Sequence, residues 1–251
     1  TIVDLGLKIR SVGVGANSLD LELAATAIPR QIVHPESAAR PEAGIPTLSN
    51  EDIDLALSGN FIGRILHAAW ASGALDFSLD ESSELDLPLN LTVGFMAQGL
   101  GPAAAGIDPQ TPLTLRTRPL LPPTAHVEVG DKPLVVDVGD LLLDFGTADG
   151  PLVTVALNLI IRVGVDFANE GALAMEVEAH VDVHETPRGP VNARQLEQSI
   201  VAIAGLVPGL LAGAADAEGA DPVPGGFDLS GAAFEADEFA PFIHVLIPLG
   251  P

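Results

Sequence analysis

The chain has 251 residues, of which 47% are hydrophobic, and its formal net charge is −23. This charge argues against a nucleic-acid partner, because phosphates need cationic side chains, and against docking on anionic lipid through a basic patch. No apolar run reaches the length of a membrane span without a charge, and the absence of cysteine excludes disulfides.

The first 50 residues combine strand patterns with an irregular stretch. Residues 1–28 predict two strands, because the leucines at positions 19, 21 and 23 alternate with acidic residues. Residues 29–50 carry four prolines and little periodicity, which indicates an irregular crossing segment. The chain begins with Thr1 rather than Met, which indicates a mature or trimmed fragment.

Residues 52–80 predict a strand, an amphipathic helix and a second strand. Ser58 is a good N-cap, because its hydroxyl can accept a hydrogen bond from a first-turn amide. Gly73 can adopt the left-handed conformation that ends a helix. One face of this helix is wide and apolar. Its residues are Phe61, Ile62, Ile65, Leu66, Ala69 and Trp70.

Alternating runs over residues 85–97 and 113–187 predict a series of further strands with glycine and proline breaks. In the last of them His180, Asp182 and His184 fall on one face, because side chains alternate along a strand. Imidazoles and a carboxylate can bind zinc, so a metal-dependent hydrolase is one interpretation of this face. The favoured interpretation is a strand surface that faces solvent.

A second amphipathic helix is predicted from about Asn192, a plausible cap, and Pro208 interrupts it. Its apolar face contains Leu196, Ile200, Ile203, Ala204, Val207, Leu210 and Leu211. Closing strands follow after a loop at residues 216–226. The order of elements predicts an α+β fold in which two helices pack on one side of a highly curved antiparallel sheet.

Catalytic signatures are lacking. The sequence has neither a cysteine nor the G-x-S-x-G elbow of a serine nucleophile, and the glycine-rich stretch at 99–106 lacks the lysine of a phosphate-binding loop. We therefore expect no enzyme activity and no cofactor. What remains is the apolar surface of the two helices, which either packs into a filled core or leaves a slot for an acyl chain.

Two stretches, at 19–29 and at 54–79, together with the proline-rich crossing between them, resemble the C-terminal half of bactericidal/permeability-increasing protein and its relatives, the tubular lipid-binding (TULIP) family. The resemblance rests on Leu57-Ser58 before the first helix, on Phe61-Ile62 within it and on the exit at residues 72–75. The downstream order also fits, with a proline-rich link at residues 119–123, three long strands, a second helix and closing strands. Two features depart from the family: the anionic charge, where the lipopolysaccharide-binding members are cationic, and the break at Pro208.

The resemblance implies that residues 1–251 form one domain, the second of two, with a super-rolled sheet wrapped around a long helix. It implies non-enzymatic binding or transfer of phospholipid or another acyl-chain ligand, a missing N-terminal partner domain, and a secreted, periplasmic or membrane-adjacent location. One wall of the tube would be the apolar face of the first helix. The facing wall would be Ile200, Ile203, Val207, Leu210 and Leu211. The alternative function is a structural or protein-interaction domain of the same fold with a filled core.

Overall fold

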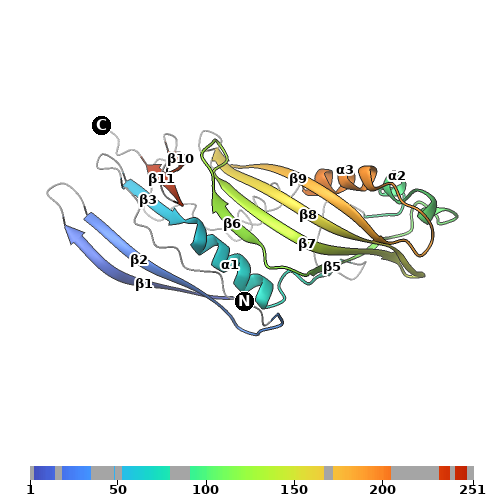
Figure 1. Ribbon diagram of the computed structural model, residues 1–251, viewed down its shortest axis with the longest axis horizontal. Coiled ribbons are helices and arrows are strands. Elements are labelled where there is room, and N and C mark those ends of the chain that lie inside the picture. The colour runs from blue at the N-terminus through green and yellow to red at the C-terminus, as the bar shows by residue number, and fades with distance from the viewer. Residues whose placement is uncertain are drawn as a thin grey trace.

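The computed structural model of the chain is an elongated assembly of antiparallel sheets and short helices (Figure 1). The structure describes residues 3–14, 19–34, 48, 53–79, 91–166, 172–204, 232–237 and 241–247. Within these residues the strands form three sheets, and every strand pair is antiparallel. The predicted mixture of helices with antiparallel strands is therefore confirmed.

The largest sheet has the strand order β4-β5-β7-β8-β9, and β6 also pairs with β7. Its long strands β7 and β8 form a hairpin, and apolar residues alternate along both. The bounds are β4 (Ser78–Leu79), β5 (Thr114–Pro119), β6 (Thr124–Val127), β7 (Leu134–Thr147), β8 (Gly150–Asp166) and β9 (Ala172–Glu185).

Asp144 of β7 links three strands of this sheet through hydrogen bonds. Its carboxylate accepts one from Arg118 of β5 (3.0 Å) and one from the Thr154 hydroxyl of β8 (2.7 Å). Burial raises the pKa of Asp144, but these hydrogen bonds and the guanidinium charge outweigh burial and hold the pKa below its usual value. The group therefore stabilises the pairing of three strands while its carboxylate is charged.

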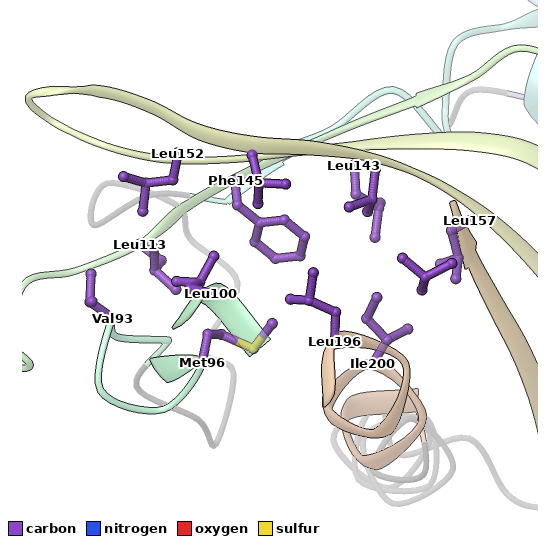
Figure 2. Packing of buried hydrophobic residues seen from close by; sticks show 13 residues of the cluster. Val93, Met96, Leu100, Leu113, Leu143, Phe145, Leu152, Leu157, Leu196 and Ile200 are labelled. Atoms are coloured by element: carbon purple, nitrogen blue, oxygen red, sulfur yellow. The ribbon is translucent and has the colours of Figure 1, made fainter. Parts of the chain in front are cut away.

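The hydrophobic core lies at the β7–β8 hairpin end of the sheet (Figure 2). Here α3 (Ala193–Ala204), the short helix α2 (Ala97–Leu100) and the 3-10 turn η1 (Gly101–Ala104) cover the sheet. Leu196 and Ile200 of α3 point toward Phe145 and Leu143 in Figure 2. Burying each such large apolar side chain contributes about 1.5–3 kcal/mol, so this end of the molecule is firmly packed.

The other two sheets are smaller and lie at the opposite end (Figure 1). One is the two-stranded β1–β2 ribbon, and the other has the order β10-β11-β3. Helix α1 follows β3 directly and packs against β6 and β2. The bounds are β1 (Val3–Val14), β2 (Leu19–Pro29), β3 (Ile53–Ser58), α1 (Gly59–Ala71), β10 (Ala233–Ala236) and β11 (Phe242–Ile247).

The predicted helix ends are largely confirmed. Helix α1 begins directly after Ser58, but the hydroxyl makes no capping hydrogen bond, so that part of the prediction is wrong. Gly73 has a φ of +77° and ends α1 as predicted, with its amide donating to the carbonyl of Trp70. Asn192 caps α3, because its Oδ1 accepts a hydrogen bond from the amide of Gln195 at 3.3 Å.

The strand predicted over residues 85–97 is wrong for the residues from 91 onward. Thr92 makes an isolated bridge to Pro112, and a turn then leads into α2. In this turn the amide of Gly94 donates to the carbonyl of Pro109 at 2.8 Å, and an added Cβ at Gly94 would lie 2.8 Å from the same oxygen. The wrapping of one sheet around a long helix stays a prediction. Among the described residues, no helix is long and apolar enough to cross a membrane.

Candidate functional site

The β1–β2 ribbon has one face that is apolar along its whole length. In β1 the apolar residues occupy odd positions up to Ile9 and even positions from Val12. The register shifts by one residue between Ile9 and Ser11, so a β-bulge at Arg10 absorbs this change. The apolar face of the ribbon comprises Val3, Leu5, Leu7, Ile9, Val12 and Val14 of β1, and Leu21, Leu23, Ala25, Ala27 and Pro29 of β2.

This apolar face is open to solvent. Leu7 is 71% exposed and Val14 is 81% exposed, and no described strand pairs with the outer edges of the ribbon. The opposite face is polar, with an ion pair of 2.8 Å between Asp4 and Arg30 whose hydrogen bond lowers the pKa of Asp4. Contiguous apolar surface of this kind marks an interaction site.

Strand β3 adds to the exposed apolar surface. Leu55 and Leu57 share one face of the strand with Ile53, and both leucines are exposed. The β11 residues paired with Leu57 and Ile53 are Ile243 and Ile247, and both are buried. The edge of this sheet therefore leaves large apolar side chains in contact with water.

Helix α1 docks on the body of the protein through its small residues. A Cβ at Gly63 would lie 3.7 Å from the backbone nitrogen of Ala125 in β6, and Gly59 also packs against β6. Trp70 lies on the same side of the helix. The indole is 2% exposed and donates a hydrogen bond from Nε1 to the carbonyl of Pro119 at 3.1 Å.

Apart from Trp70, the large apolar residues of α1 lie away from this docked side or on its flanks. Phe61 and Ile65 point to the side opposite Gly59 and Gly63, since they are two and six residues beyond Gly59 on a helix of 3.6 residues per turn. All of the predicted lining residues of α1 other than Trp70 are half-buried: Phe61, Ile62, Ile65, Leu66 and Ala69. Strand β2 runs beside α1 and contacts it (Figure 1).

Ile200, the one residue of the predicted facing wall whose side chain the structure describes, does not lie near α1 and the ribbon. Ile200 of α3 is buried in the core at the hairpin end, and α3 packs on β9 and α2. Figure 1 shows α3 and α1 at different ends of the largest sheet. The side chain of Ile203 and residues Val207, Leu210 and Leu211 lie outside the described part of the chain.

A latch at residues 31–34 joins the ribbon to the end of α1. The amides of Val33 and His34 donate to the carbonyl of Ala71, at 2.6 and 3.1 Å. The His34 ring stacks on Trp70 with centroids 4.6 Å apart, and its Nε2 lies 3.1 Å from Oδ2 of Asp76. The ribbon is therefore held at one end, next to the C-terminus of α1. Sequence reasoning missed this latch because its partners are 36 or more positions apart.

A polar hollow of about 300 Å³ opens on the other face of the β10-β11-β3 sheet. His244 lies between two carboxylates there, with Nδ1 2.8 Å from Oδ1 of Asp54 and Nε2 3.6 Å from Oδ2 of Asp237, and none of the three side chains is more than 10% exposed. The lining contains no hydroxyl or thiol that would serve as a nucleophile. It consists of Leu48, Asp54, Glu235, Ala236, Asp237, His244 and Leu246. We interpret the contacts of His244 with Asp54 and Asp237 as structural links between neighbouring strands.

The metal interpretation of β9 gains no support. His180 contacts Asp182 and Glu197 at 3.4 Å each, on an exposed surface. Glu197 in turn accepts a hydrogen bond from the amide of Val181, which fixes α3 to β9. Within the part of the chain that the structure describes, no group of three or more histidine, cysteine or acidic residues is placed to hold a metal ion.

Comparison with known proteins finds a likeness among solved structures. No protein-family model matches the chain, and no curated protein matches it. Among solved structures, the chain is similar to a crystal structure of lipopolysaccharide binding protein, with a TM-score of 0.43 and 16% sequence identity over 98% of this chain and 54% of that one. The chain thus spans about half the length of that protein. A likeness at this level establishes neither a fold nor a family.

Proposed function

We propose that the chain binds lipid acyl chains or similar apolar ligands, without catalysis, between the apolar face of the ribbon and helix α1. The observation that carries this proposal is the apolar face of the ribbon, which stays continuous across the bulge and is exposed. A two-stranded ribbon is marginally stable in water on its own. An acyl chain laid along it would remove apolar surface from water at about 25 cal/mol per Å².

The residues of α1 support the same site. Phe61 and Ile65 lie on the side of α1 opposite the glycines that contact β6, so they take no part in that contact. Their half-buried state leaves apolar area that a ligand can cover. Sites for apolar ligands are lined mainly by such side chains, with few polar groups.

The net charge of the chain restricts which head groups a bound lipid can carry. With 34 acidic and 11 basic residues, the chain repels anionic head groups at distances within the Debye length. The ligand class that fits is an acyl chain with a neutral or zwitterionic head group. The anionic glycolipid in the name of the structural neighbour does not fit this charge.

The test is lipid extraction together with probe binding. Mass spectrometry of organic extracts from the purified protein is expected to find lipid, and a fluorescent fatty acid is expected to bind. Leu7→Asp places a charge on the apolar face of the ribbon and is expected to weaken probe binding about tenfold or more, because burying an unpaired carboxylate costs more than the 1.4 kcal/mol that a factor of ten represents.

Ile28→Asp is the matched control. Ile28 lies opposite Asp4 on the polar face of the same ribbon and is 58% exposed, so its replacement changes the same charge without touching the proposed site. Probe binding by this variant is expected to equal that of the wild type. If no lipid is extracted and no probe binds, the ligand proposal fails, and the alternative of a structural or protein-interaction domain takes its place.

A further inference from the structure

The apolar face of the ribbon is longer than the helix beside it. Helix α1 has 13 residues and spans about 20 Å, whereas β1 has 12 residues and spans about 40 Å. We call residues 3–9 and 23–29 the ribbon root and residues 11–14 and 21–22 the ribbon tip. The latch fixes the root next to α1, and the tip runs on past the start of that helix (Figure 1).

The ribbon tip is aliphatic. Its apolar face presents Val12, Val14 and Leu21, all of them at least half exposed. Interfaces between proteins are enriched in aromatic residues, methionine and arginine at their centres, and their energetic anchors are mostly Trp, Tyr and Arg. The apolar face of the ribbon contains none of these, and it offers no shaped anchor to a protein partner. An aliphatic surface of this composition is complementary to the hydrocarbon of lipid acyl chains.

The charge of the ribbon differs from that of the rest of the molecule. Residues 1–34 contain three basic and three acidic residues and are therefore neutral, so the whole formal charge of −23 lies in the remainder of the chain. Near the tip, Arg10 pairs with Glu22 at 3.3 Å and the Ser11 hydroxyl donates to the same carboxylate at 2.9 Å, so residues 10–22 keep one net negative charge, that of Asp20. The ribbon is the part of the chain that can approach a surface without net repulsion.

We propose that the ribbon tip docks on a membrane of zero net charge by inserting its apolar face into the boundary between head groups and acyl chains. The polar face of the ribbon then points to water, and its backbone edges stay at the head-group level, where water satisfies them. The ribbon root and α1 lie beside the surface from which a lipid is taken. The purpose of this docking, which is to bring the acyl-chain site to a membrane, rests on the proposed function. The test of the docking does not depend on that function.

The test is flotation of the full chain with phosphatidylcholine vesicles. The wild type is expected to float with the vesicles, and raising the salt to about 0.5 M is expected to leave binding unchanged, because no exposed charge attraction is involved. Val14→Asp is expected to reduce the bound fraction about tenfold or more. Val129→Asp is the matched control, since Val129 is 75% exposed, close to the 81% of Val14, and lies in the β6–β7 connection. This variant is expected to float like the wild type.

Several results would overturn the proposal. They are failure of the wild type to float, equal flotation of Val14→Asp, a requirement for anionic lipid, and loss of binding in salt. Sedimentation provides one more: a wild-type dimer that Val14→Asp converts to a monomer would show that the tip contacts a second copy. Equal thermal unfolding of the variants is the folding control, because the replaced side chains are exposed.

The two proposals fail separately. Probe binding is measured without vesicles and flotation is measured without the probe, so each proposal has an assay of its own. A protein that binds the probe but no vesicles refutes the docking of the ribbon tip alone. A protein that floats with vesicles but binds no probe refutes the acyl-chain site and leaves the docking in place.

Discussion

Replacing Gly63 by alanine is expected to stabilise the protein, although Gly63 is buried between α1 and β6. Alanine is favoured over glycine within a helix by about 0.5–1 kcal/mol. The added Cβ would lie 3.7 Å from the backbone nitrogen and 3.9 Å from the oxygen of Ala125, which is ordinary van der Waals contact. The buried methyl group adds about 0.8 kcal/mol, so the expected gain is about 1–2 kcal/mol in the free energy of unfolding.

Urea unfolding followed by tryptophan fluorescence measures this gain, because Trp70 is the only tryptophan of the chain and lies in the same helix. Two further variants bracket the result. Gly59→Ala brings its Cβ to 3.0 Å from Cγ2 of Val127 and is expected to be neutral or destabilising. Gly63→Leu is expected to cost about 1–3 kcal/mol by overpacking. A loss of stability in Gly63→Ala would refute the docking of α1 on β6 at this distance.

Three other predictions concern the latch, the sheet and the core. Val33→Cys with Gly73→Cys is expected to form a disulfide, because a Cβ at Gly73 lies 3.3 Å from that of Val33. A disulfide of this kind contributes about 2–4 kcal/mol to the unfolding free energy. The strain of a non-glycine residue at the φ of +77° of position 73 subtracts about 1–2 kcal/mol from this gain. Persistent free thiols after oxidation would contradict the latch. The lowered pKa of Asp144 means that its stabilisation is present above about pH 4 and is lost as the pH falls through that lowered value. Wild type and Asp144→Asn should therefore differ in urea midpoint at pH 7 and converge in acid, and a constant difference would speak against it. Leu196→Ala, at a position with no exposed area, should cost about 2–5 kcal/mol in the same assay, while the exposed control Val129→Ala should cost less than about 0.5 kcal/mol.

Local sequence patterns were sufficient for the elements that depend on neighbours along the chain. The alternation of leucines predicted β2, and the apolar periodicity and Gly73 predicted α1 with its end. These patterns depend only on residues close together in the sequence, so they predict the element without knowledge of the rest of the fold. The capping bond of Ser58 was not predictable in the same way, because the residue type allows the bond without requiring it.

The docked side of α1 could not be predicted from the apolar pattern. That pattern follows the large side chains Phe61 and Ile65, whereas close packing on β6 uses Gly59 and Gly63, where side chains are absent. The pairing of Asp54 with His244 was equally hidden, since 190 positions separate the two residues. Both features arise from contacts between distant segments, on which periodicity within one segment carries no information.

The bulge at Arg10 also bears on aggregation. Strand β1 pairs only with β2 among the described strands, so its other edge is a free row of backbone donors and acceptors beside an apolar face. Such an edge is a template for pairing with another chain, and natural proteins interrupt it with bulges and charged residues. Arg10 is the bulged residue and also carries a charge. Deleting it would remove the bulge and leave a regular strand, with the last two valines of β1 still on the apolar face, which would turn a protected ribbon into a segment prone to form fibrils.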